Sequence, residues 1–95
     1  MQEVYELTML FKADLEPILE ETLKRVRKTI KKYDGAILKE ENDGKKRLAY
    51  SINGEEYAIY YYMELDLANA LDISKELNVN DDILRYLLVK QTVRS

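Results

Sequence analysis

The residues best suited to chemistry are three consecutive cations, Lys45, Lys46 and Arg47, which follow Gly44. Side-chain cations neutralise phosphates, and this neutralisation supplies most of the affinity of proteins for nucleic acid. A second interpretation is that charged side chains on an edge strand oppose aggregation. The spacing of the three cations agrees with both interpretations.

Catalytic side chains are scarce in the chain, which has no histidine and no cysteine. Imidazole bases, thiol nucleophiles and the usual transition-metal sites are therefore excluded. The acids in the pairs Glu40–Glu41 and Asp81–Asp82 are adjacent, so in extended structure their side chains point apart and cannot share a proton. The three glycines are assigned to turns and form no phosphate-binding loop. We predict a protein without enzymatic activity, cofactor, metal or small-molecule substrate.

Length and composition predict one domain, residues 1–95, because a chain of 95 residues can build one two-layer core. The net charge is −3, which is the opposite of a typical nucleic-acid-binding domain, so any RNA contact has to be local. The N-terminal segment carries Glu3 and Glu6 where an export signal would be apolar, and no apolar run reaches the length of a bilayer span. We expect no membrane partner and a cytoplasmic location.

The first half of the chain predicts a strand and a helix. Residues 4–11 alternate in polarity, with Tyr5, Leu7, Met9 and Phe11 directed to a core. A helix is expected from Asp14, acting as its N-cap, to about residue 33. Gly35 is expected to end this helix in a left-handed conformation.

A long, irregular second strand is expected over residues 36–52, interrupted by a turn or bulge at residues 42–44. Asn53-Gly54 is a favoured hairpin loop and places Ile52 opposite Glu55. Extending that register places Tyr50 opposite Tyr57 and Leu48 opposite Ile59. The third strand then directs its residues 59, 61, 63 and 65 to the core.

A second helix, over about residues 69–77, and a fourth strand from residue 83 complete the pattern. The order strand, helix, strand, strand, helix, strand is that of the α+β ferredoxin-like split βαβ sandwich. We therefore expect a four-stranded antiparallel sheet with two helices on one face.

The opposite sheet face would carry Tyr60 and Tyr62. Aromatic residues at such positions stack on RNA bases in some domains of this topology. Tyrosine is also a common strand residue, and the third strand lacks the basic-aromatic octapeptide of those domains. The sequence agrees with both base stacking and ordinary strand preference as the role of these tyrosines.

A basic run over residues 24–32 contains six cations in nine positions. We interpret it as a solvated helix surface. Glu20 with Lys24 and Glu21 with Arg25 have the i, i+4 spacing of ion pairs, and the helix dipole favours cations near the C-terminus.

Four segments resemble the bacterial small-subunit ribosomal protein six family: Tyr5-Glu6, Tyr33-Asp34-Gly35, GKKRLAY over residues 44–50 and NDDILRYLLVK over residues 80–90. The resemblance covers almost the whole chain. It implies the same element order, binding to the central domain of small-subunit ribosomal RNA, and a heterodimer with small-subunit ribosomal protein eighteen.

The resemblance also implies site residues. The expected RNA contacts are Lys45, Lys46, Arg47, Tyr50, Arg85, Lys90 and Arg94. Candidates for the partner-protein contact are Glu40, Glu41, Tyr60, Tyr62 and Glu64. Gln2 and Glu3 stand where family members commonly carry cations, which places an N-terminal RNA contact in doubt.

An alternative hypothesis is a ferredoxin-like regulatory or dimerisation module that does not bind the ribosome. In that case the open sheet face, with Tyr60 and Tyr62, would pair with a copy of itself. A stable homodimer without affinity for ribosomal RNA would favour this alternative.

Overall fold

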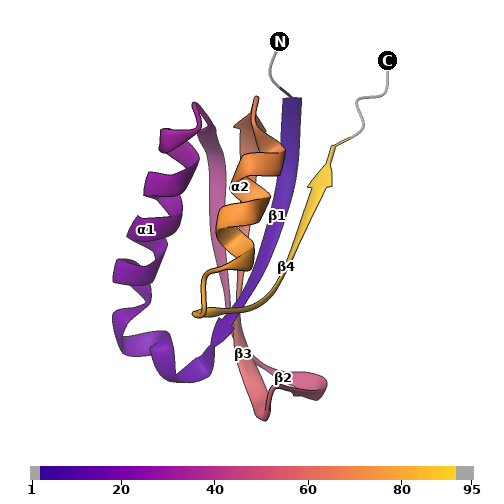
Figure 1. The fold of residues 1–95 in the computed structure, drawn as a ribbon. Coiled ribbons are helices and arrows are strands. Elements are labelled where there is room, and N and C mark those ends of the chain that lie inside the picture. The colour runs from indigo at the N-terminus through magenta and orange to yellow at the C-terminus, as the bar shows by residue number, and fades with distance from the viewer. Residues whose placement is uncertain (1–2, 92–95) are drawn as a thin grey trace.

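The computed structural model describes residues 3–91, and these residues form one antiparallel sheet with both helices on one face (Figure 1). The elements are β1 (Glu3–Lys12), a 3₁₀ helix (Ala13–Ile18), α1 (Leu19–Lys32), β2 (Ala36–Ile52), β3 (Glu55–Leu67), α2 (Ala70–Asn78) and β4 (Ile83–Lys90). The strand order is β2-β3-β1-β4, with antiparallel neighbours throughout. The predicted ferredoxin-like fold is confirmed.

The core lies between the helices and the sheet, as the alternation in β1 and β3 predicts. Leu7, Met9 and Phe11 of β1 are fully buried, and alternate β3 residues from Ile59 to Leu65 are buried beside them. The two helices cover these side chains with an apolar stripe each, namely Leu19, Leu23, Val26 and Ile30 from α1 and Ile73 and Leu77 from α2. No helix within residues 3–91 is long and apolar enough to cross a membrane.

The first helix begins later than the sequence predicts. Residues 13–18 form a 3₁₀ helix, α1 starts at Leu19, and Asp14 makes no capping hydrogen bond. Pro17 lies inside the 3₁₀ segment. Proline has no N–H to donate and disfavours the α conformation in the residue before it, so a regular α-helical turn is disfavoured there.

The end of α1 also differs from the prediction, because Asp34 and not Gly35 takes the left-handed conformation, with φ 60°. The N–H of Gly35 donates to the carbonyl of Ile30 at 2.8 Å, and the N–H of Asp34 donates to that of Lys31, which together form a Schellman motif. A Cβ atom on Gly35 would lie 2.8 Å from side-chain atoms of Ile30 and Leu67. Gly35 is therefore needed for close packing.

The β2–β3 turn forms as predicted, but the register beyond it does not. Asn53 and Gly54 both have positive φ, and Ile52 lies opposite Glu55. The next pairs are Arg47 with Tyr57 and Lys45 with Ile59, so the expected partners Tyr50 and Leu48 are wrong.

Burial explains the irregular register of this hairpin. Leu48 and Ile52 are buried against Ala58 on the face opposite the helices, and Leu10, Tyr60 and Leu84 pack around them. Burial of these apolar side chains outweighs the regular ladder that an uninterrupted register would keep. The hairpin consequently bends where it extends beyond the helical layer (Figure 1), and it covers part of the sheet face that the sequence left open.

Candidate nucleic-acid interface

A kink at Gly44 positions the three cations of β2. Gly44 has φ 87°, its N–H donates to the Oδ1 of Asn42 at 2.8 Å, and the register with β3 shifts at this point. A positive φ suits glycine because it has no Cβ. The kink therefore sets which face of the sheet each following side chain occupies.

Alternation after the kink divides the cations between the two faces, so they do not form one continuous ridge. The Nζ of Lys45 lies 5.4 Å from the ring centroid of Tyr57, and the Nζ of Lys46 lies 5.2 Å from that of Tyr60. Tyr57 and Tyr60 are on opposite sides of β3. Arg47 lies opposite Tyr57 and so shares the face of Lys45.

These three cations remain available for a ligand. Each is exposed, and none forms an ion pair with any residue of the described range 3–91. Tyr50 is 72% exposed and lines a shallow hollow with Arg47 at the bent end of the hairpin. Tyr50 and Arg47 are therefore both accessible from this hollow.

Arg85 and Lys46 both lie on the open face, in neighbouring cross-strand rows and on opposite edges of the sheet. Tyr60 lies opposite Leu10 across β3 and β1, and Leu10 lies opposite Arg85 across β1 and β4. In the next cross-strand row of this face, Ala58 of β3 lies between Lys12 of β1 and Lys46 of β2. Lys12 was not predicted as a site residue. The alternation of β1 places it on the face opposite the core, and this pattern could have identified it.

The remaining predicted RNA contacts lie elsewhere. Lys90 is near the opposite end of β4, opposite Tyr5, and its Nζ lies 2.7 Å from the Oε2 of Glu3. The hydrogen bond to Glu3 raises the pKa of Lys90. Arg94 lies outside the described residues.

The other half of the open face is acidic. The hydroxyl of Tyr62 lies 2.9 Å from the Oε1 of Glu6 and 3.1 Å from the Oε2 of Glu64, and it donates to these carboxylates. Glu6 and Glu64 are directly opposite each other, and Glu41 lies opposite Tyr62. Burial, and then the hydrogen bonds to the two carboxylates, raise the pKa of Tyr62.

No cation neutralises this acidic half in the part of the chain that the structure describes. Lys39 lies opposite Glu64, yet no ion pair joins them. Leu87 lies in the cross-strand row of Tyr62, and Val89 lies in the row of Glu6 and Glu64. Their exposed fractions are 62% and 45%. Within residues 3–91, no cluster of acids has the geometry to hold a metal ion.

Glu40 is directed to the opposite face, where it is bound within the molecule. Its carboxylate accepts hydrogen bonds from the Nε of Arg27 at 3.1 Å, the Nη2 of Arg27 at 2.9 Å and the hydroxyl of Tyr61 at 2.7 Å. The Arg27 hydrogen bonds hold the pKa of Glu40 below its usual range. The structure thus separates Glu40, which joins α1 to β2, from Glu41, which lies with the acidic half.

Comparison with known proteins identifies relatives over nearly the whole chain. The family model described as Ribosomal protein S6 matches residues 4–90. Small ribosomal subunit protein bS6 of Chlamydia abortus is 33% identical over 91 residues, which is 93% of this chain and 81% of that protein. The protein of the same name from Chlamydia trachomatis serovar D is 31% identical over 91 residues.

A solved structure supports the fold independently. The crystal structure of 30S ribosomal protein S6 from Thermotoga maritima superposes with a TM-score of 0.86 and covers 96% of this chain and 89% of that one. Its sequence identity is 23%, so this likeness concerns the fold.

Proposed function

The chain belongs to the Ribosomal protein S6 family, and from this premise we propose that it is a structural, non-enzymatic component of the small ribosomal subunit in the cytoplasm. It binds the central domain of small-subunit ribosomal RNA, and it does so as a heterodimer with small-subunit ribosomal protein eighteen. The observation that carries this proposal is the division of the open sheet face into a cationic half and an acidic half.

The cationic half and the hairpin contact RNA. Lys46 lies beside Tyr60 on the open face and Arg85 lies in the cross-strand row of Tyr60, while Lys45 and Arg47 extend the positive charge to the other side of the hairpin. Lysine and arginine contacts of this kind bind phosphate and sugar, and they position a protein without reading the base sequence. Tyr50 is exposed next to Arg47 and supplies an aromatic face for a base.

The acidic half contacts the partner protein. Glu6, Glu41 and Glu64 surround Tyr62 without a neutralising ion pair within residues 3–91, and Leu87 and Val89 add exposed apolar area beside them. A surface of this composition complements a basic protein that supplies both cations and apolar side chains. The partner contact therefore explains why a nucleic-acid-binding chain has a negative net charge.

A binding experiment tests the RNA contact. In the presence of protein eighteen, the variant Lys45→Ala/Lys46→Ala/Arg47→Ala should bind the central-domain RNA more weakly than wild type. The slope of log K against log salt should become shallower by about 2.1–2.7, because each of the three lost phosphate contacts removes about 0.7–0.9 from it.

Controls separate loss of binding from loss of fold. Lys75→Ala removes an exposed, unpaired cation from α2 and should leave binding unchanged. Circular dichroism should show a folded triple variant. An unchanged affinity and salt slope in that variant would count against the hairpin as the RNA contact, and a wild-type homodimer with no RNA affinity would favour the dimerisation module.

A further inference from the structure

The outer surface of α1 carries a second group of cations, which we call the lysine ridge and define as Lys24, Lys28 and Lys31. Their spacing of four and three residues places them on one side of the helix. All three are exposed, and none forms an ion pair or a hydrogen bond through its side chain with another residue of the described range. The ridge is separate from the hairpin cations and lies on the helical side of the molecule.

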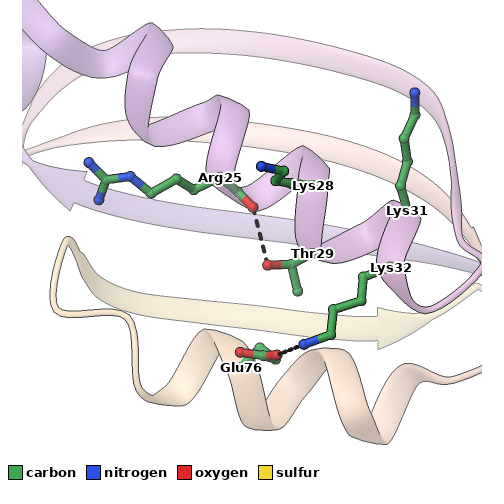
Figure 2. A pocket seen from close by; sticks show the side chains of 6 residues that line it. All are labelled: Arg25, Lys28, Thr29, Lys31, Lys32 and Glu76. Carbon is green, nitrogen blue, oxygen red and sulfur yellow. Dashed lines mark hydrogen bonds and ion pairs between the residues drawn. The ribbon is translucent and has the colours of Figure 1, made fainter.

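The ion pairs expected from i, i+4 spacing are not formed, and this leaves the ridge unneutralised. Glu20 pairs with Arg27 at 2.7 Å and not with Lys24, while Arg25 pairs with Asp82 at 3.5 Å and not with Glu21. Lys32, next to the ridge, does find an acid and lies 3.2 Å from Glu76 of α2. Figure 2 shows Lys32 directed toward Glu76 while Lys31 extends away from α2.

Helix stability does not account for the ridge. Lysines at i, i+4 and i, i+3 repel one another, and such like-charged pairs destabilise a helix. The helix dipole favours cations in the last turn, which includes Lys31, but the effect does not extend to Lys24 or Lys28. Three repelling charges on one face are explained better by an external anion.

The surroundings of the ridge favour a phosphate backbone over an acidic protein. Arg25, Lys28 and Lys31 each line two hollows, whose other lining residues are Lys24, Arg27, Thr29, Lys32, Ile37 and Glu76. Ile37 is the only large apolar residue among them, and it is partly buried in the core. A protein interface usually has exposed apolar or aromatic anchors at its centre, whereas flexible lysines suit phosphate groups.

We propose that the lysine ridge binds the phosphate backbone of a second ribosomal RNA segment, distinct from the one at the hairpin. This inference rests on the proposed function, which supplies RNA as the partner class. The helical rise from Lys24 to Lys31 is about 10 Å, a length that spans several phosphates of one strand. The contact positions the helical side of the protein against RNA and does not read sequence.

A charge-matched pair of variants tests the ridge in the complex with protein eighteen and small-subunit ribosomal RNA. Lys28→Gln removes one ridge charge with little change in helix propensity, whereas Lys75→Gln removes one unpaired charge from α2. The ridge variant should reduce the salt slope by about 0.7–0.9 and lower affinity about threefold, while the control should keep the wild-type slope.

A proximity experiment locates the RNA. The chain has no cysteine, so Lys28→Cys gives one attachment point for a tethered hydroxyl-radical source, and Lys75→Cys gives the control. Cleavage of ribosomal RNA in the assembled subunit should occur from position 28 and be absent or much weaker from position 75.

The outcomes distinguish this inference from the proposed function. If wild-type protein with its partner does not bind RNA, the proposed function fails and the ridge fails with it. If the hairpin variant loses affinity while the ridge variant and the tether at position 28 have no effect, only the ridge is overturned. If the source tethered at position 28 cleaves a neighbouring protein and not RNA, the ridge is overturned in favour of an acidic protein partner.

Discussion

At the scale of single residues, the direction of a side chain decides what an acid or a tyrosine does. Glu40 and Glu41 are neighbours in sequence, but Glu40 binds Arg27 and Tyr61 on the helical side while Glu41 lies opposite Tyr62 on the open face. Likewise, Tyr61 faces the helical side, where it contacts Glu40, and Tyr62 faces the open side, where it contacts Glu6. Neighbouring residues of one type therefore belong to different faces, one on the helical side and one on the proposed partner surface.

Glu40→Gln should reduce the free energy of unfolding by about 1 kcal/mol at pH 7, because the charged hydrogen bonds to Arg27 are weakened. The pKa of Glu40 is lowered in the folded state. Its contribution is therefore present above the unfolded pKa of about 4.3 and is lost as the pH falls through the folded pKa. Urea unfolding should show a difference between wild type and variant at pH 7 that shrinks toward pH 3, and a constant difference would contradict this origin.

Tyr62→Phe should destabilise the protein by about 1 kcal/mol, because the variant removes the only hydroxyl that donates to the facing carboxylates of Glu6 and Glu64 within residues 3–91. The cost should be smaller in a Glu6→Gln/Glu64→Gln background, where there is no charge pair to stabilise. A double-mutant cycle by thermal unfolding measures this coupling. Equal costs in the two backgrounds would show that the hydroxyl acts independently of the acids.

At the scale of elements, two glycines end or bend an element for different physical reasons. Gly44 has φ 87° and open space where a Cβ would lie, whereas Gly35 lacks a positive φ but lies against Ile30 and Leu67. Position 44 needs glycine for its positive φ, and position 35 needs glycine because a Cβ would be too close to Ile30 and Leu67. Gly44 kinks β2 and so sets which face each hairpin cation occupies, and Gly35 lets β2 start close to α1.

This difference predicts opposite rankings of substitutions. At position 44, Gly44→Asn should be tolerated better than Gly44→Ala, because asparagine enters the left-handed region more easily, and the alanine variant should cost about 1 kcal/mol. At position 35, the smaller Gly35→Ala should be tolerated better than Gly35→Asn, with a cost of about 1–3 kcal/mol from overpacking. Chemical denaturation of the four variants measures both rankings, and the same ranking at both positions would refute the distinction.

At the scale of the whole molecule, charge is segregated although the net charge is only −3. The hairpin, the lysine ridge and the half of the open face around Tyr60 are cationic, while the half around Tyr62 is acidic. In the proposed function, separate patches of opposite sign let one small domain contact RNA and a basic protein at the same time. The global composition conceals this arrangement because the patches cancel in the sum.

Glu6→Gln/Glu64→Gln should weaken binding to protein eighteen while changing the free energy of unfolding by less than about 1 kcal/mol, since the lost hydrogen bonds are offset by relief of like-charge repulsion. Calorimetric titration measures the affinity and thermal unfolding measures the stability. As a matched control, Glu55→Gln/Glu56→Gln removes two acids from the start of β3 and should leave the affinity close to that of wild type. Unchanged binding in Glu6→Gln/Glu64→Gln would show that the acidic half is not the docking surface.

The sequence by itself determined the element order, the sheet topology, the core faces of β1 and β3 and the Asn53-Gly54 turn. Each depends on a local signal, such as period-two alternation, a helical apolar stripe or a two-residue turn that tolerates positive φ. Such signals act between neighbours in sequence and can be read without coordinates. The three cations after Gly44 were recognisable as a candidate site for the same reason.

Only the tertiary structure decided how the hairpin bends, which acids are bound internally and which cations share a surface. Leu48 and Ile52 shift the register because they are buried against Ala58, and Arg27 reaches Glu40 because α1 packs beside β2. Lys46 and Arg85 share one sheet face because of the pairing of all four strands, which no sequence spacing expresses. These outcomes depend on contacts between distant segments, whose burial and charge energies compete only once the sheet and helices have packed.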